Sequence, residues 1–128
     1  MATVDDVRAV AARLPGGEER TTISGTSWFV RSKPFVWECR PWPSIPEPIR
    51  TVIATEQVIG LKVGDAIDAQ ALRQMYPRVF LSQTTRWGEP KVAFRLAEIG
   101  AEHLTELVVE AWRVQAPKYL VRAFDDQS

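Results

Sequence analysis

Residues 101–124, AEHLTELVVEAWRVQAPKYLVRAF, carry the pattern that most constrains what this chain can fold into. Apolar residues recur there at the spacing of an α-helix, opposite a side of acidic residues and Arg113, and form one stripe of Leu104, Leu107, Val108, Ala111 and Trp112. An isolated amphipathic helix is marginal in water, so this stripe requires an apolar surface elsewhere in the chain. Pro117 cannot continue the helix but suits the first turn of another, which predicts a short docked helical tail over residues 118–124.

The rest of the chain predicts that surface to be a sheet. Thr3 and Asp6 mark the start of a first helix that ends at Leu14, and a short helix follows Gly64 and Asp65 until Pro77 stops it. Strand-like content is found in residues 26–31, 35–40, 50–54, 57–63, 79–84 and 91–96. This order predicts an α+β fold, an antiparallel sheet with its helices packed on one face, in a single domain over residues 1–128 whose helical tail spans residues 117–128.

Period-two alternation assigns strand residues to the two faces of that sheet. We expect the helices to cover Phe35, Trp37, Cys39, Val92, Phe94 and Leu96, and expect the opposite face to show Val36, Glu38, Arg40, Lys91, Ala93 and Arg95. Residues 26–40 and 79–96 then form two hairpins, the second with Trp87 near its tip. Residues 40–48, RPWPSIPEP, contain four prolines and predict a connector between strand groups, which we favour over a polyproline ligand.

Composition excludes several classes of protein. Sixteen Lys and Arg balance sixteen Asp and Glu, so no global field attracts nucleic acid or lipid and any such binding needs a local patch. With Cys39 and His103 as the sole residues of their types, neither a disulfide framework nor a Cys/His zinc site is possible. No cofactor is needed for folding. The sequence shows no leader and no apolar run that could cross a bilayer, so we expect a cytoplasmic protein.

Four blocks of the sequence resemble a known family. VDDVRAVAARLPGGEER, GTSWFVRSKPFVWECRP, VIGLKV and EAWRVQAPKYL, in this order and spacing, are similar to the MmcQ/YjbR family of small bacterial proteins. This resemblance implies a fold like the frataxin-like CyaY arrangement, and a DNA-binding label that rests on likeness to a double-wing arrangement of hairpins. It implies no catalytic residue. Residues 85–90, TRWGEP, depart from the family pattern, in which a histidine and a Gly-Tyr pair are frequent.

The sheet face that the helices leave open is predicted to be basic. The candidate nucleic-acid-binding residues on this face and its hairpins are Arg31, Lys33, Arg40, Lys62, Arg86, Trp87, Lys91 and Arg95, set against Glu38 alone. Acidic residues gather on the helices instead. The sequence therefore predicts a non-enzymatic, monomeric binding protein with DNA or another nucleic acid as partner, without membrane or metal. Two alternatives stay open: a merely solvated sheet face, and a protein- or small-molecule-binding pocket lined by Trp28, Phe29 and Trp87.

The remaining reactive residues predict no chemistry. His103 has no evident acid or nucleophile partner, which favours a solvated or capping histidine, and Cys39 is expected to be a buried, inert thiol. The frataxin-like fold raises the question of iron. Asp5 and Asp6 are a short pair already explained by the dipole of the first helix, so we expect no metal site.

Overall fold

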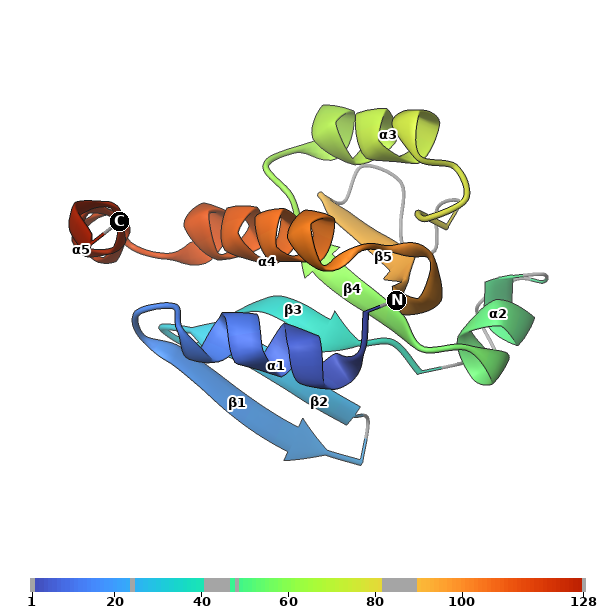
Figure 1. Cartoon of the computed structure of the whole chain (residues 1–128), viewed down its shortest axis with the longest axis horizontal. Helices are drawn as coiled ribbons and strands as arrows, with labels where there is room; N and C mark the ends of the chain where they lie inside the picture. Colours follow the sequence, from blue (N-terminus) through green and yellow to red (C-terminus); the bar gives the residue numbers. More distant parts are fainter. Residues whose placement is uncertain (1, 24, 41–46, 48, 82–89, 128) are drawn as a thin grey trace.

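The structure is a computed structural model that describes residues 2–23, 25–40, 47, 49–81 and 90–127 (Figure 1). Its elements follow in the order α1 (Val4–Ala12), β1 (Gly17–Thr22), β2 (Gly25–Val30), β3 (Lys33–Glu38), α2 (Ile49–Thr55), β4 (Val58–Lys62), α3 (Ala66–Met75), β5 (Lys91–Arg95), the 3₁₀ turn η1 (Leu96–Glu98), α4 (Ala101–Gln115) and α5 (Lys118–Gln127). The five strands form one antiparallel sheet in sequence order. The predicted α+β class is therefore confirmed.

The apolar stripe of α4 supplies the centre of the core. Figure 1 shows α1 and α4 side by side on one face of the sheet, called the covered face below, and α4 packs on β3, β4 and α1. Trp112 is fully buried, and its indole N–H donates to the Pro15 carbonyl at 3.1 Å. Phe35 and Phe94 are fully buried in the same cluster. The surface that the stripe requires is thus the covered face together with α1.

Helix α1 begins where the sequence predicts. The Thr3 hydroxyl accepts from the Asp6 amide while the Asp6 carboxylate accepts from the Thr3 amide, a reciprocal capping box. Val7, Val10 and Ala11 are buried. The capping fixes the start of the helix, and the spacing of these three residues places them on one side of it.

Strand β1 is absent from the prediction. All six of its residues, GEERTT, are exposed, so neither apolar alternation nor β-branched enrichment marks the whole segment as a strand. Its pairing with β2, from Gly17 opposite Val30 to Thr22 opposite Gly25, makes it a strand. Tertiary pairing overrides a weak local signal here.

Strand β3 corrects the predicted orientation of Trp37. The β2–β3 register shifts between Trp28 and Phe29, so that Phe35 is an extra residue, and Phe35 and Val36 are both fully buried. Beyond this bulge Val36 pairs with Leu61 of the covered face, whereas Trp37 pairs with Gly60 on the opposite face. The prediction that Trp37 and Cys39 face the helices is wrong, because one bulged residue reverses the alternation that follows it.

Helix α2 replaces a predicted strand at residues 50–54. Ile49 and Ile53, four residues apart, are buried on one side of the helix and cluster with Val58 and Ala93. The register places Val58 and Ala93 on the face opposite α1 and α4. Helix α2 therefore covers one end of that face.

The strand predicted at residues 79–84 is reduced to one bridge in the described part, between Phe80 and Phe94. Residues 82–84, the tip of the predicted second hairpin and residues 41–46 of the predicted proline-rich connector lie outside the described residues.

The predicted helical tail is confirmed as α5. Phe124 lies edge-on to Trp112 with ring centroids 5.2 Å apart, and Arg113 donates to Asp125 at 2.6 Å. Hydrogen bonding and charge from Arg113 hold the pKa of Asp125 below its usual value. In the part of the chain that the structure describes, no helix is long and apolar enough to span a bilayer.

Trp112→Ala should lower the free energy of unfolding by about 3–5 kcal/mol, because it leaves a large cavity and an unpaired Pro15 carbonyl. Urea denaturation measures this loss. Val114→Ala is the matched control on α4, since Val114 is 41% exposed, and should change stability by less than about 0.5 kcal/mol. Equal effects of the two changes would contradict the role given to Trp112.

Asp125→Asn tests the attachment of α5 through pH. Because the folded pKa of Asp125 is lowered, its ion pair contributes stability above the unfolded pKa, near 3.8, and loses it as pH falls through the folded value. Wild type should therefore melt at a higher temperature than Asp125→Asn at pH 6. The gap should close as pH falls below about 3.8. A gap independent of pH would contradict this ion pair.

Candidate nucleic-acid interface

The sheet face turned away from α1 and α4, called the open face below, is organised as rows of paired residues. One row crosses all five strands through Arg20, Ser27, Trp37, Gly60 and Ala93. A neighbouring row pairs Lys62 with Lys91, and Phe29 pairs with Pro34 on the hairpin side. Since α2 covers the end near Ala93 and Val58, the part of this face that no described helix covers lies around Trp37.

Trp37 packs closely on the backbone of β4 because its neighbour there is glycine. A Cβ atom on Gly60 would stand 2.2 Å from Trp37 Nε1 and 2.5 Å from Cε2, so the indole occupies the space of the missing side chain. The Lys91 ammonium lies 5.9 Å from the centroid of the same ring. Trp37 thus forms an aromatic floor in the middle of the open face.

Phe29 and Arg20 form a second pair of aromatic ring and cation. The Arg20 guanidinium carbon lies 4.6 Å from the centroid of the Phe29 ring, and Arg20 also pairs with Glu18 at 3.1 Å. The prediction omitted Arg20, because residues 17–22 show no strand pattern. Only the pairing of β1 with β2 reveals which way this side chain points.

A hollow of about 320 Å³ lies between these aromatic residues. It is lined by Ser27, Phe29, Pro34, Trp37, Lys62, Lys91 and Gln115. Gln115, from the end of α4, donates from Nε2 to the Pro34 carbonyl at 2.9 Å, which holds one wall in place. The hollow therefore combines two aromatic side chains, two lysines and two uncharged polar side chains.

The structure brings two of the predicted site residues, Lys62 and Lys91, into this hollow. Arg95 shares the open face, but its guanidinium donates to both oxygens of Glu56, at 2.9 and 3.0 Å, and lies 3.8 Å from Glu98. The hydrogen bond to Glu56 raises the pKa of Arg95. These carboxylates neutralise the charge that Arg95 was predicted to present.

Three further predicted cations lie away from the hollow. Arg31 occupies the two-residue β2–β3 turn, where it and Ser32 have φ of 51° and 68°, the left-handed conformation of a type I′ hairpin. Lys33 pairs with Val30 of the covered face. Arg40 lies 3.9 Å from Glu38, which the register also places on the covered face, so the predicted orientation of this pair is wrong because of the β3 bulge. Arg86 and Trp87 lie outside the described residues.

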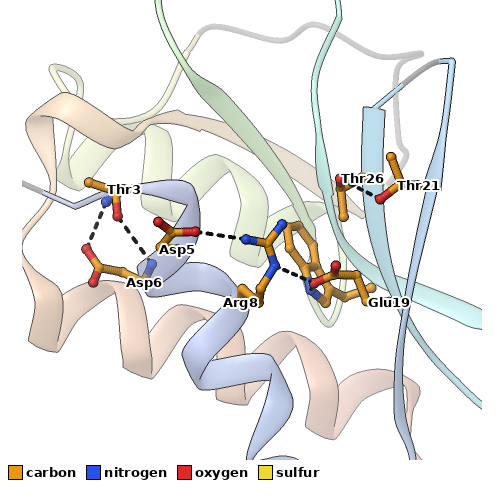
Figure 2. A network of polar contacts seen from close by, with 8 residues as sticks. Thr3, Asp5, Asp6, Arg8, Glu19, Thr21 and Thr26 are labelled. Carbon is orange, nitrogen blue, oxygen red and sulfur yellow. Dashed lines mark hydrogen bonds and ion pairs between the residues drawn. The ribbon is translucent and has the colours of Figure 1, made fainter.

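Trp28 does not line the hollow, contrary to the alternative prediction of a pocket that included it. Its side chain is buried on the covered face, and its indole N–H donates to Glu19 Oε1 at 2.9 Å. Figure 2 shows Arg8 of α1 between Glu19 and Asp5, at 2.8 Å from each carboxylate. Within the described ranges no group of three or more His, Cys, Asp or Glu residues is arranged to hold a metal ion.

Cys39 and His103 lie in packed surroundings. Burial raises the pKa of the Cys39 thiol to about 12, so the thiolate is scarce at neutral pH. The His103 ring lies 4.8 Å from the Tyr76 ring and 6.4 Å from that of Phe80. Both residues therefore have a packing role in the described structure.

Comparison with known proteins identifies relatives of the chain. The uncharacterised proteins Rv2570 of Mycobacterium tuberculosis and Mb2600 of Mycobacterium bovis are each 37% identical to it over 128 residues, covering 97% of this chain and 96% of theirs. The chain belongs to the same family as these mycobacterial proteins. No family model matches it. The crystal structure of the Deinococcus radiodurans DUF419-domain protein DR2400 has the same fold, with a TM-score of 0.66 at 22% identity over 88% of this chain and 77% of that one.

Gly60→Ala should lower the free energy of unfolding by about 1–3 kcal/mol, because the new methyl group overlaps the Trp37 ring. In a Trp37→Ala background the same change should cost little, since the overlapping ring is gone. A double-mutant cycle by urea denaturation measures this coupling. Gly100→Ala is the control, since a Cβ there meets nothing within 4 Å and should not couple to Trp37. An equal cost in both backgrounds would exclude the contact.

Proposed function

We propose that this chain is a non-enzymatic protein that binds nucleic acid through its open face. The observation that carries the proposal is the partly exposed indole of Trp37, packed against Gly60 and bordered by Lys62 and Lys91. Bases stack on exposed aromatic rings, and ammonium groups attract the phosphates that join them. An aromatic ring beside lysines therefore provides the two kinds of contact that a nucleic acid uses.

The distribution of charge supports the same proposal. On α4, Glu102, Glu106 and Glu110 are exposed on the side of the sheet that carries the covered face. Asp5 and Asp6 lie at the start of α1 on that side as well. On that side the five carboxylates outnumber the three cations Arg8, Arg13 and Arg113, whereas Lys62 and Lys91 border Trp37, so a polyanion would approach the open face first.

We also assign the chain to the MmcQ/YjbR family. The four sequence blocks that resemble this family support the assignment, and the fold shared with DR2400 agrees with it. A DNA-binding label for that family is consistent with the open face as the interface. The particular residues would be Lys62 and Lys91, joined by Arg20 and Trp37.

A second candidate function is the binding of a small molecule in the hollow, without any role for nucleic acid. Its volume of about 320 Å³ falls at the lower end of the range of roughly 300–1,000 Å³ that ligand sites occupy. The lining favours a planar, anionic ligand, because ring faces and ammonium groups meet there.

Lys62→Ala tests the proposed interface. A labelled oligonucleotide should bind the wild type at low salt, and its affinity should fall linearly on a log–log plot as salt increases. Lys62→Ala should weaken binding and reduce the salt slope by about one, because one phosphate contact is lost. Fluorescence anisotropy at several salt concentrations measures both effects.

Arg13→Ala is the matched control, since it removes an exposed cation from the end of α1, on the other side of the sheet. Its binding and salt slope should equal those of the wild type. The proposed function is wrong if no oligonucleotide binds at low salt, or if Arg13→Ala and Lys62→Ala weaken binding equally.

A further inference from the structure

We infer that the hollow between Phe29 and Trp37 is a subsite for one unpaired nucleobase, with its phosphate at Lys62. The open face would then select single strands over duplex. This inference rests on the proposed function and specifies the form of nucleic acid that the face takes.

The aromatic lining is arranged for one planar ring. Trp37 on β3 forms the floor and pairs with Ser27 on β2. Phe29, two residues after Ser27 on the same strand, borders the same space. Phe29 is held against β1 by the Arg20 guanidinium, 4.6 Å from its centroid. Both rings are partly exposed and come from neighbouring strands, so a base can contact them together.

The hollow has room for a nucleobase. At about 320 Å³ it is small for a ligand site, and Pro34 and Gln115 close one side. In a duplex the faces of each base are covered by its stacked neighbours, and only the edges are accessible. A paired base would therefore have to leave the stack, at a cost of a few kcal/mol, before it could enter. An unpaired base avoids this cost.

Charge and hydrogen bonding complete the subsite. Lys62 lines the hollow and makes no ion pair with a described residue, in contrast to Arg95, whose charge Glu56 neutralises on the same face. The Ser27 hydroxyl and the Gln115 amide can form hydrogen bonds with the edge of a base. Gln115 Nε2 already donates to the Pro34 carbonyl, which leaves its Oε1 as an acceptor. Lysine contacts a phosphate as a compact point charge, without the fixed fork of arginine.

The test compares three probes at one low salt concentration: a labelled single-stranded 12-mer, the matching duplex and adenosine 5′-monophosphate. The single strand should bind more tightly than the duplex, and the mononucleotide should quench tryptophan emission and compete with the single strand. Trp37→Leu should weaken single-strand binding about fivefold to 150-fold, which corresponds to one stacked base, and leave duplex binding unchanged. Phe29→Leu is a second variant that should act in the same direction.

Tyr76→Leu is the control for the loss of an aromatic ring, because Tyr76 packs on His103 at the end of α4 opposite Gln115. It should not change single-strand binding. Two results would overturn this inference and leave the proposed function intact. One is salt-dependent binding that neither Trp37→Leu nor Phe29→Leu changes, and the other is equal affinity for duplex and single strand. Binding of the mononucleotide without any oligonucleotide overturns the proposed function. No binding of any probe overturns both.

Discussion

The burial of the α4 stripe between the sheet and α1 is the interaction on which the other features depend. Trp112 is its centre, since it is fully buried, bonds to the Pro15 carbonyl beyond α1 and lies against Phe124 of α5. One tryptophan thus joins α4 to the α1–β1 turn and to the C-terminal helix. A sheet of five strands has two faces, and among the described elements α1 and α4 cover one of them while α2 covers one end of the other.

Packing under α4 also decides what the open face displays. The β3 bulge allows Phe35 and Val36 both to enter the core, and the strand leaves the bulge with Trp37 directed outward. A large aromatic ring on a solvated face is accommodated because Gly60 leaves room for it beside the backbone. The aromatic floor therefore has a structural cause in the core. The proposed role of Trp37 in binding depends on the outward direction that the β3 bulge gives it.

Electrostatics on the open face depend on partners more than on the count of cations. In the sequence Arg95 and Lys62 are equivalent strand cations. In the structure the carboxylate of Glu56, directly after α2, accepts two hydrogen bonds from Arg95 and neutralises its charge. Arg20, in contrast, was not predicted at the site. It lies in a polar segment that forms the edge strand β1, and this strand holds it beside Phe29. What remains around Trp37 is a small local patch, in keeping with a chain of zero net charge.

Local patterns in the sequence were sufficient for α1, α4, α5 and the alternation of β5, because capping, a 3.6-residue period and a two-residue period each depend on near neighbours. They also predicted Lys62 and Lys91 at the candidate site. The strand β1, the helix α2 and the outward direction of Trp37 could not be read in this way. Pairing with β2, burial of Ile49 and Ile53 on a second small cluster, and one bulged residue at Phe35 produced them. All three depend on contacts between one segment and another, backbone pairing for β1 and burial of apolar side chains for α2 and β3, and these contacts override the local preference of each segment.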